Sequence, residues 1–242
     1  MKNFRKIVNK SMNDEQLFDS IADKYDTFTG IDEVRLHILN NRRNMINKYM
    51  YRDVNFGSIL EFGVGTGVLL NEITATRKVG IDLSEKMCEV TRNRFDHIKT
   101  IKGDILIYKD DKKYDNVFCS AFLHHIAYNS MDELEKAVLN MKATLKDKGR
   151  IIILESNPYN PYWYLFMRQV GEFNAKLLSM RGLCDLLIEN NIKLIKYKYY
   201  GFMPNFCPKW AFKTFKALES IIERIPILRM FLCSHYIIIG ER

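Results

Sequence analysis

Short hydrophobic runs alternate with amphipathic segments along most of the chain after residue 57. Nearly continuous apolar runs are typical of strands buried on both faces, and the segments between them carry the three- and four-residue spacing of helices. The predicted strands are Ser58–Phe62, Lys78–Ile81, Ile98–Ile101, Asn116–Ser120, Arg150–Leu154, Lys193–Tyr200 and Tyr236–Gly240. This alternation predicts an α/β fold in which helices cover both faces of a parallel sheet.

Helices are predicted at both ends of the chain as well as between the strands. They span 13–28, about 31–49, Val68–Ala75, Glu85–Phe95, Met131–Leu145, Ser179–Glu189 and Lys209–Ile225. In the first of them, three- and four-residue steps separate the apolar residues Leu17, Phe18, Ile21, Tyr25 and Phe28. Its expected N-cap is Asn13 or Asp14.

The helix predicted at Lys209–Ile225 is amphipathic and basic. Its apolar stripe consists of Ala211, Phe215, Leu218, Ile222 and Ile225, and opposite it lie Lys209, Lys213, Lys216, Ser220 and Arg224. Two roles are open for this helix. It covers the sheet and leaves a basic face in water, or it rests on an anionic membrane to reach a lipophilic substrate.

Residues 59–67 are the most informative stretch, because an apolar strand runs into Gly63, Gly65 and Gly67 and then directly into a helix. Glycine at alternate positions lets the backbone turn tightly and approach a ligand, and a helix N-terminus offers N–H groups. The site suits a nucleoside-bearing cofactor at the carboxyl end of the first strand. A dinucleotide fingerprint would have a third glycine at position 68, where this chain has Val68.

The observed motif is E-x-G-x-G-x-G, and four further blocks follow it at regular places. They are ValGlyIleAspLeuSer (79–84), LysGlyAspIle (102–105), AspAsnValPheCysSerAlaPheLeuHisHis (115–125) and LeuLysAspLysGlyArg (145–150). In order and spacing these blocks, all within 57–155, resemble the class I S-adenosylmethionine-dependent methyltransferases. Residues 18–26 also resemble the N-terminal cover helix of the quinone-type and other small-molecule methyltransferases. The resemblance implies a Rossmann-like, seven-stranded, mostly parallel sheet with an antiparallel last strand, and S-adenosyl-L-methionine as cofactor.

The resemblance also implies a set of cofactor-binding residues around the three glycines. Asp82 would accept both hydroxyls of a ribose, Asp104 would lie near the adenine amino group, and Tyr25 would close over the cofactor. The set is completed by Leu83, Ile105 and Ser120. Simpler interpretations stay open, since Asp82 also suits a helix cap and Asp104 a turn.

Glu61 and a pair of histidines are further candidates. Glu61 faces the carboxyl end of the sheet, so we expect it to contact the glycine loop or the amino acid end of the cofactor; a surface acid is the alternative. His124 and His125 are adjacent, cannot share one helix face and make a poor metal pair, so no metal is expected. His125 suits a general base, because an unperturbed histidine pKa is about 6.5. Alternatively, the pair orders the loop or lends backbone groups to the methionine end of the cofactor.

We expect one methyltransferase domain over 1–242. Its parts are N-terminal cover helices (1–50), a cofactor-binding core (57–155), an aromatic insertion (156–175) and the C-terminal half of the sheet (176–242). The insertion holds Tyr159, Tyr162, Trp163, Tyr164 and Phe166. Such a density of aromatic rings suits a lid over an apolar or planar substrate, or else a helix packed on the domain.

Composition and charge restrict the class of partner. A chain of 242 residues that is 47% hydrophobic is long enough for one large α/β domain with a buried core. Its 5 scattered cysteines form no C-x-x-C pair and indicate reduced thiols. Because neither a signal peptide nor a spanning helix is evident, we expect a cytoplasmic protein, peripheral at the membrane if it meets one. The net charge of +8 favours a polyanionic partner or serves only solubility.

A nucleic-acid acceptor is disfavoured by two motifs. After the fourth strand CysSerAlaPheLeu stands where enzymes that methylate base amines have Asp/Asn-Pro-Pro-Tyr/Phe, and Cys207-Pro208 reverses the Pro-Cys of cytosine enzymes. The sequence therefore predicts in-line methyl transfer to a small, lipophilic or aromatic acceptor. A nucleic-acid methyltransferase, a non-catalytic cofactor-binding subunit and an NAD-dependent oxidoreductase are the alternatives. The oligomeric state is not indicated.

Overall fold

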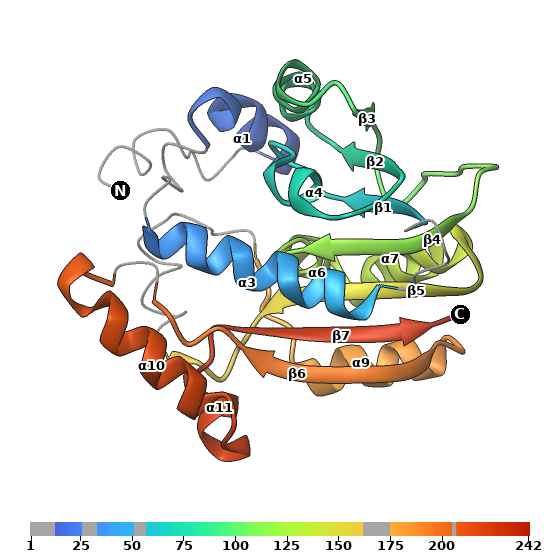
Figure 1. Ribbon diagram of the computed structural model, residues 1–242. Helices are drawn as coiled ribbons and strands as arrows, with labels where there is room; N and C mark the ends of the chain where they lie inside the picture. Colours follow the sequence, from blue (N-terminus) through green and yellow to red (C-terminus); the bar gives the residue numbers. More distant parts are fainter. Residues whose placement is uncertain (1–12, 26–32, 51–56, 162–174, 205–206) are drawn as a thin grey trace.

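A computed structural model describes residues 13–25, 33–50, 57–161, 175–204 and 207–242, and Figure 1 shows the arrangement of their elements. The helices and short helical turns are α1 (Asp14–Ile21), η2 (Ala22–Lys24), α3 (Glu33–Tyr49), α4 (Val68–Glu72), α5 (Glu85–Arg94), α6 (Leu123–Asn129), α7 (Met131–Ala143), α9 (Met180–Glu189), η3 (Lys209–Ala211), α10 (Phe212–Ile222) and α11 (Pro226–Leu232). The strands are β1 (Ser58–Phe62), β2 (Arg77–Asp82), β3 (Ile98–Lys102), β4 (Tyr114–Ser120), β5 (Leu145–Ser156), β6 (Lys193–Tyr200) and β7 (His235–Glu241).

The strands of the described part form one 7-stranded sheet in the order β3-β2-β1-β4-β5-β7-β6. Parallel pairing joins β3, β2, β1, β4 and β5, whereas β7 is antiparallel to both of its neighbours, β5 and β6. The expected Rossmann-like sheet with an antiparallel last strand is thereby confirmed. Its parallel strands end at one edge, which is the usual ligand-binding edge of such sheets.

The predicted strands agree closely with the observed ones except at β5. β1 and β6 have the predicted bounds, and β2, β3, β4 and β7 extend one or two residues further. The strand predicted to begin at Arg150 begins at Leu145, which pairs with Tyr114. The chain bulges between these two pairings, with Lys148 at a φ of 62°, and regular pairing resumes at Arg150. A local bulge of this kind looks like a turn in the sequence.

The N-terminal helix is shorter than predicted and is capped by Asn13. The Asn13 side chain accepts from Gln16 N at 2.9 Å, and the Gln16 side chain accepts in return from Asn13 N at 3.4 Å. This capping box resolves the choice between Asn13 and Asp14. The predicted tail of the helix at 26–28 lies outside the described residues.

The C-terminal helix prediction is wrong in two respects. Residues 209–225 divide into η3 and α10, which ends at Ile222, and α11 follows as a separate helix that was not predicted. Ile225 is extended before Pro226, as residues that precede proline prefer to be. In addition, Leu218 and Ile225 of the predicted apolar stripe are 41% exposed, while Glu219 is buried.

Glu219 is buried because it satisfies polar groups of neighbouring elements. Its Oε1 contacts His37 Nε2 at 2.7 Å and accepts from Asn41 Nδ2 at 2.9 Å, both on α3. Its Oε2 accepts from Met203 N at 2.7 Å. A hydrophobicity pattern alone does not reveal that a glutamate is buried. Because Glu219 faces inward, the buried side of α10 differs from the predicted one.

α6 was also not predicted, because no polar face marks it. Most of its residues are buried, including both histidines. Without an apolar stripe and a contrasting polar one, the periodicity that predicts a helix is lost.

The two faces of the sheet are buried under different helices. α6, α7 and α9 contribute Leu123, Leu134, Val138, Leu183 and Leu187 to the core on one face. α3 and α4 contribute Ile46 and Leu70 to the core on the other face. Figure 1 shows α3 crossing one side of the sheet with α7 and α9 on the other. Because side chains alternate along a strand, each acid at the carboxyl edge belongs to one of these two faces.

Candidate functional site

The glycine loop between β1 and α4 needs glycine at all three positions. Gly63, Gly65 and Gly67 have φ values of 75°, 54° and 74°. A Cβ on Gly63 would lie 2.6 Å from Phe122 Cδ2, and one on Gly67 would lie 2.5 Å from Thr91 Cγ2. A Cβ on Gly65 would meet nothing within 4 Å. Gly65 is therefore the glycine whose backbone is open to a ligand.

β2 and α5 hold this loop in place. Gly63 N and Val64 N donate to Ile81 O at 2.8 and 3.0 Å. Gly65 N donates to Asp82 Oδ2 at 2.8 Å, and Gly65 O accepts from Thr91 Oγ1 at 2.8 Å. Hydrogen bonds at both its N–H and its carbonyl thus fix the position of Gly65.

Asp82 lies directly beside this open position. Its Oδ2 binds Gly65 N, and its Oδ1 accepts from Ser84 N at 3.0 Å. Burial raises the pKa of Asp82, and the N–H groups of Ser84 and Gly65 offset only part of this effect. A carboxylate oxygen accepts more than one hydrogen bond, so Asp82 keeps acceptor capacity for a ribose hydroxyl.

Glu61 is a buried acid on the α3 face of β1. It is 2% exposed, and its Oε2 has no hydrogen-bond partner within the described part of the chain. Burial, and then the nearby charge of Asp82, raise the pKa of Glu61 well above its usual value, while Arg42 acts in the opposite direction. The expected hydrogen bond to the glycine loop is not made by this oxygen. A cation is the group that would satisfy it best.

Arg42 on α3 was not identified from the sequence. Its Nη2 contacts His235 Nε2 at 2.9 Å. Burial, and then the charge of Arg42, lower the pKa of His235 well below its usual value, so the neutral ring accepts this hydrogen bond. Because α3 is polar along most of its length, nothing in its pattern distinguishes Arg42 from its neighbours.

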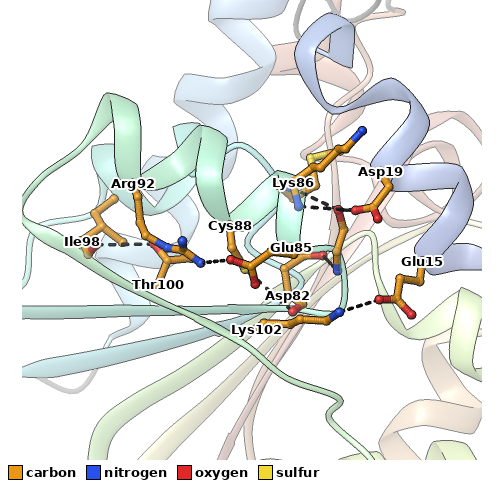
Figure 2. A network of polar contacts seen from close by, with 12 residues as sticks. Glu15, Asp19, Asp82, Glu85, Lys86, Cys88, Arg92, Ile98, Thr100 and Lys102 are labelled. Atoms are coloured by element: carbon orange, nitrogen blue, oxygen red, sulfur yellow. Dashed lines mark hydrogen bonds and ion pairs between the residues drawn. The ribbon is translucent and has the colours of Figure 1, made fainter.

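The cover helix α1 is attached over the ends of β2 and β3 by polar contacts (Figure 2). Lys102 Nζ, at the end of β3, donates to Glu15 at 2.7 Å. Asp19 accepts from Ser84 Oγ and, at 3.4 Å, from Lys86 N at the start of α5. Tyr25 packs with Phe18 against the small core of Ile21, Ala22 and Met87. The structure therefore brings Tyr25 to the β2 side of the carboxyl edge.

The remaining residues expected around an adenine lie at the ends of β2 and β3. Asp104 is half-buried, and its Oδ1 accepts from Leu106 N at 2.8 Å. Leu83 is 39% exposed, whereas the side chain of Ile105 is buried in the main core. Leu83 therefore has an apolar side chain available to a ligand. Ile105 offers its backbone N–H, since its carbonyl accepts from Asn140 Nδ2 at 2.7 Å.

Glu155, at the end of β5, organises the loop after β4 and was not identified from the sequence. Its Oε1 accepts from Phe122 N at 2.8 Å and from Leu123 N at 2.7 Å, and its Oε2 contacts His124 Nδ1 at 2.8 Å. Burial acts to raise the pKa of Glu155, but His124 and the two N–H groups outweigh it and lower the pKa. The position of this acid after a buried strand, like those of Glu61 and Asp82, was the available signal.

Ser120 ends β4, and His125 lies in α6, the helix that follows. The His125 ring contacts His124 at a centroid distance of 4.3 Å and Phe18 of α1 at 5.6 Å. Its Nδ1 is 3.8 Å from Asp14 Oδ2. Ser120 Oγ is buried and has no hydrogen-bond partner among the residues that the structure describes. Both side chains therefore belong to the same edge of the sheet as the glycine loop.

A surface depression of about 350 Å³ is separate from this site. It is lined by Gly57, Ser58, Thr76, Arg77, Lys113, Asp115 and Lys146. Gly57, Ser58 and Arg77 lie at the amino ends of β1 and β2, so the depression is at the opposite edge of the sheet. It plays no part in the arrangement described above.

The sheet topology defines a Rossmann-like protein, and the glycine loop and buried acids lie at the edge of the sheet where such folds usually bind ligands. Residues 60–153 match the family described as methyltransferase domain. An uncharacterized methyltransferase of Bacillus mycoides (strain KBAB4) is 31% identical over 148 residues, which cover 58% of this chain and 66% of that relative. The chain thus spans slightly less than two thirds of the length of this relative.

Solved structures share the fold. A SAM-dependent methyltransferase from Archaeoglobus fulgidus has a TM-score of 0.63 and 19% identity, covering 90% of this chain and 97% of its own. The N-methyltransferase NodS from Bradyrhizobium japonicum WM9, in complex with S-adenosyl-l-homocysteine, has a TM-score of 0.61 and 12% identity, covering 100% of this chain and 97% of its own. Residues 60–153 are thus similar to methyltransferase domains, and the chain shares its fold with methyltransferases of known structure. The dinucleotide interpretation of the glycine loop is thereby set aside.

Proposed function

We propose that the protein transfers the methyl group of S-adenosylmethionine to a small, lipophilic or aromatic acceptor. One observation carries the cofactor assignment: Asp82 binds the open glycine, Gly65, and its charge acts on Glu61, whose buried Oε2 lacks a partner within the described residues. S-adenosylmethionine has a ribose and an ammonium group, which match the acceptors on Asp82 and Glu61. A ligand without a hydrogen-bond donor at this position would leave Glu61 unsatisfied.

The residues of the site bind and orient the cofactor and the acceptor, and they supply no electrons to the reaction. S-adenosylmethionine provides an electrophilic methyl carbon on a sulfonium, and the departing thioether needs no proton. We assign Asp82 to the ribose hydroxyls, Glu61 to the ammonium group, and Asp104 with Leu83 and the Ile105 backbone to the adenine. The protein accelerates the displacement by aligning the acceptor with the methyl carbon and excluding water.

We assign His125 to proton removal when the acceptor is a hydroxyl. Its position between the end of β4 and Phe18 supports this role, and Asp14, 3.8 Å away, is the nearby carboxylate that would favour the imidazolium form. Of the aromatic lid predicted at 156–175, residues 162–174 lie outside the described part of the chain. The lid, the lipophilic acceptor and a cytoplasmic location therefore stay predictions.

The cofactor assignment is tested by Asp82→Ala. We expect about tenfold weaker binding of S-adenosylmethionine by isothermal titration calorimetry, because a ribose hydroxyl that loses its acceptor costs about 1–3 kcal/mol. Asp96→Ala is the matched control, since Asp96 is fully exposed on a loop away from the site. Unchanged affinity in Asp82→Ala would refute the assignment of this residue.

The acceptor class is tested by label transfer. The protein is incubated with S-adenosylmethionine labelled on its methyl group and with a cell extract separated into organic-soluble compounds, RNA and protein. We expect label in the organic-soluble fraction. Label in RNA would favour the nucleic-acid alternative, and cofactor binding without transfer to any fraction would favour a non-catalytic subunit.

A further inference from the structure

α11 is a largely apolar helix, and its apolar side chains are nevertheless exposed to solvent. Its sequence is PILRMFL, and none of its residues is buried. Ile227, Leu228 and Phe231 are 71%, 38% and 49% exposed. An exposed cluster of large apolar side chains is unusual on a protein surface and marks a contact with something else.

α10 extends this cluster. Leu218 and Ile221 are 41% and 55% exposed, and Ile225, between the two helices, is 41% exposed. Positions 218 and 221 follow helical spacing and so share one side of α10, and Ile225 follows in the extended connection to α11. We call the six residues Leu218, Ile221, Ile225, Ile227, Leu228 and Phe231 the apolar face. Trp210, 87% exposed, precedes α10 at its other end.

The apolar face is held in place by backbone contacts rather than by burial of its side chains. Asn157 Nδ2 donates to Met230 O at 2.7 Å and to Cys233 O at 2.8 Å. Asn160 Nδ2 donates to Leu232 O at 2.9 Å. These bonds anchor the C-terminal end of α11 to the segment that follows β5. The described fold therefore holds the apolar face in a defined position.

In the same segment, the acidic side chains bind groups of the fold and the basic side chains are exposed. Glu219 points inward to α3 and Met203 N, and Glu223 binds Lys198 and, at 2.9 Å, Gly201 N. The basic residues Lys209, Lys213, Lys216 and Arg224 are exposed, and none of them forms an ion pair with a carboxylate of the described residues. Both acids of the segment thus have partners within the fold, and the exposed charged side chains of the segment are basic.

We propose that the apolar face docks on an anionic membrane surface, with its basic neighbours meeting the lipid headgroups. Apolar side chains flanked by Lys and Arg, with a Trp at the margin, are the pattern of helices that lie in a membrane interface. A second copy of the chain fits less well, because a two-fold contact would bring like charges together. Among the described residues, no helix is long and apolar enough to cross a membrane.

Docking through this surface would bring the site close to lipid. In Figure 1, α10 lies on the side toward which the arrows of β1, β2 and β4 point, which is the edge that carries the glycine loop. α10 is also joined through Glu219 to α3, the helix that carries Arg42. The sequence placed the membrane contact on Lys209–Ile225; the structure shifts its apolar part toward α11.

Sedimentation with vesicles tests the proposal and requires no methyl transfer. The full chain is mixed with vesicles of phosphatidylcholine, with and without phosphatidylglycerol. We expect binding only to the anionic vesicles, weakened by salt. Ile227→Asp should weaken it by about tenfold or more, and Lys213→Glu by about fivefold. Both positions are exposed, so circular dichroism should show unchanged folding.

Matched controls separate this face from general stickiness. Ile188→Asp changes an apolar side chain that is 55% exposed on α9, and Lys136→Glu changes an exposed lysine on α7. Neither control should alter vesicle binding. A wild-type protein that stays in the supernatant with anionic vesicles would overturn the proposal, as would equal loss in Ile188→Asp and Ile227→Asp. A dimer in analytical ultracentrifugation that Ile227→Asp dissociates would assign the face to a second copy instead.

Discussion

Glu61 and Glu155 lie at the same edge of one sheet and are 2% and 1% exposed, but their pKa values shift in opposite directions. Glu61 belongs to the face of β1 that α3 and α4 cover. Glu155 belongs to the other face, beside α6. Burial costs both carboxylates the same kind of hydration energy, so the difference comes from their partners.

The partners of the two acids differ in kind. Glu155 receives two backbone N–H groups and the His124 ring, which satisfy both oxygens within the fold. Glu61 has an oxygen without a partner in the described structure, and the charge of Asp82 makes ionisation of Glu61 more costly. An internally satisfied acid builds the fold, whereas an unsatisfied acid at a ligand-binding edge is available to a ligand. The comparison thus separates a structural carboxylate from a binding one.

The largest effect is expected at Glu155. Glu155→Ala leaves two N–H groups and His124 without their acceptor, and removing one partner from a buried network costs about 3 kcal/mol or more. Urea denaturation measures this loss as a lower free energy of unfolding. Glu61→Gln is the matched variant and should not destabilise the protein. Similar losses in both would show that the two acids have the same structural role.

The glycine loop provides the second comparison, between Gly67 and Gly65. Gly67→Ala should cost about 2 kcal/mol or more, because the left-handed backbone and the overlap with Thr91 add together. Gly65→Ala should cost only about 1 kcal/mol, because its Cβ meets no neighbour. In Gly65→Ala the methyl group occupies ligand space, so calorimetry should show a larger fractional loss of cofactor affinity than of stability. Equal stability of the two variants would contradict this distinction.

Much of the fold follows from local pattern. β1 and β6 were predicted with their bounds, because a run of apolar or alternating residues between turn signals is a local property. The glycine loop was also visible, since positive φ values demand glycine whatever the rest of the chain does. The antiparallel direction of β7 came from resemblance to a family and not from its own residues.

The missing parts depend on contacts between distant residues. Arg42 meets His235 across 193 positions, and Glu219 meets His37 across 182. No window of sequence contains both partners, so the inward turn of Glu219 and the exposure of the α11 side chains were not predictable. Glu155 was predictable by the rule that selected Asp82, namely an acid at the end of a buried strand.

A pH series sharpens the comparison of the two glutamates. The pKa of Glu61 is raised in the folded state, so between about pH 4.5 and that raised value the folded state binds more protons than the unfolded one. The Glu61 contribution to stability therefore falls as pH rises through this window. Glu61→Gln should therefore gain stability relative to wild type as pH rises through this window, measured by urea denaturation at several pH values.

Glu155 has the opposite dependence, because its pKa is lowered in the folded state. Its contribution is present above the ordinary glutamate pKa and is lost as pH falls through the lowered value. Glu155→Ala should therefore approach wild-type stability in acid. A Glu61→Gln variant whose advantage does not change with pH would remove the basis for treating Glu61 as a strained acid.

The smallest effect is expected at the cover helix α1, which lies over the ends of β2 and β3 rather than inside the fold. Its ion pair of Glu15 with Lys102 is 36% and 48% exposed, and pairs of this kind add little to stability. Asn13→Ala removes the capping box and should cost about 1 kcal/mol or less. Hydrogen exchange should accelerate at Leu17 and Ile21 and remain unchanged in β5, with Asn93→Ala on α5 as the control. Faster exchange in β5 as well would mean that α1 and the Glu155 region unfold together, and the two halves of the site would no longer be independent.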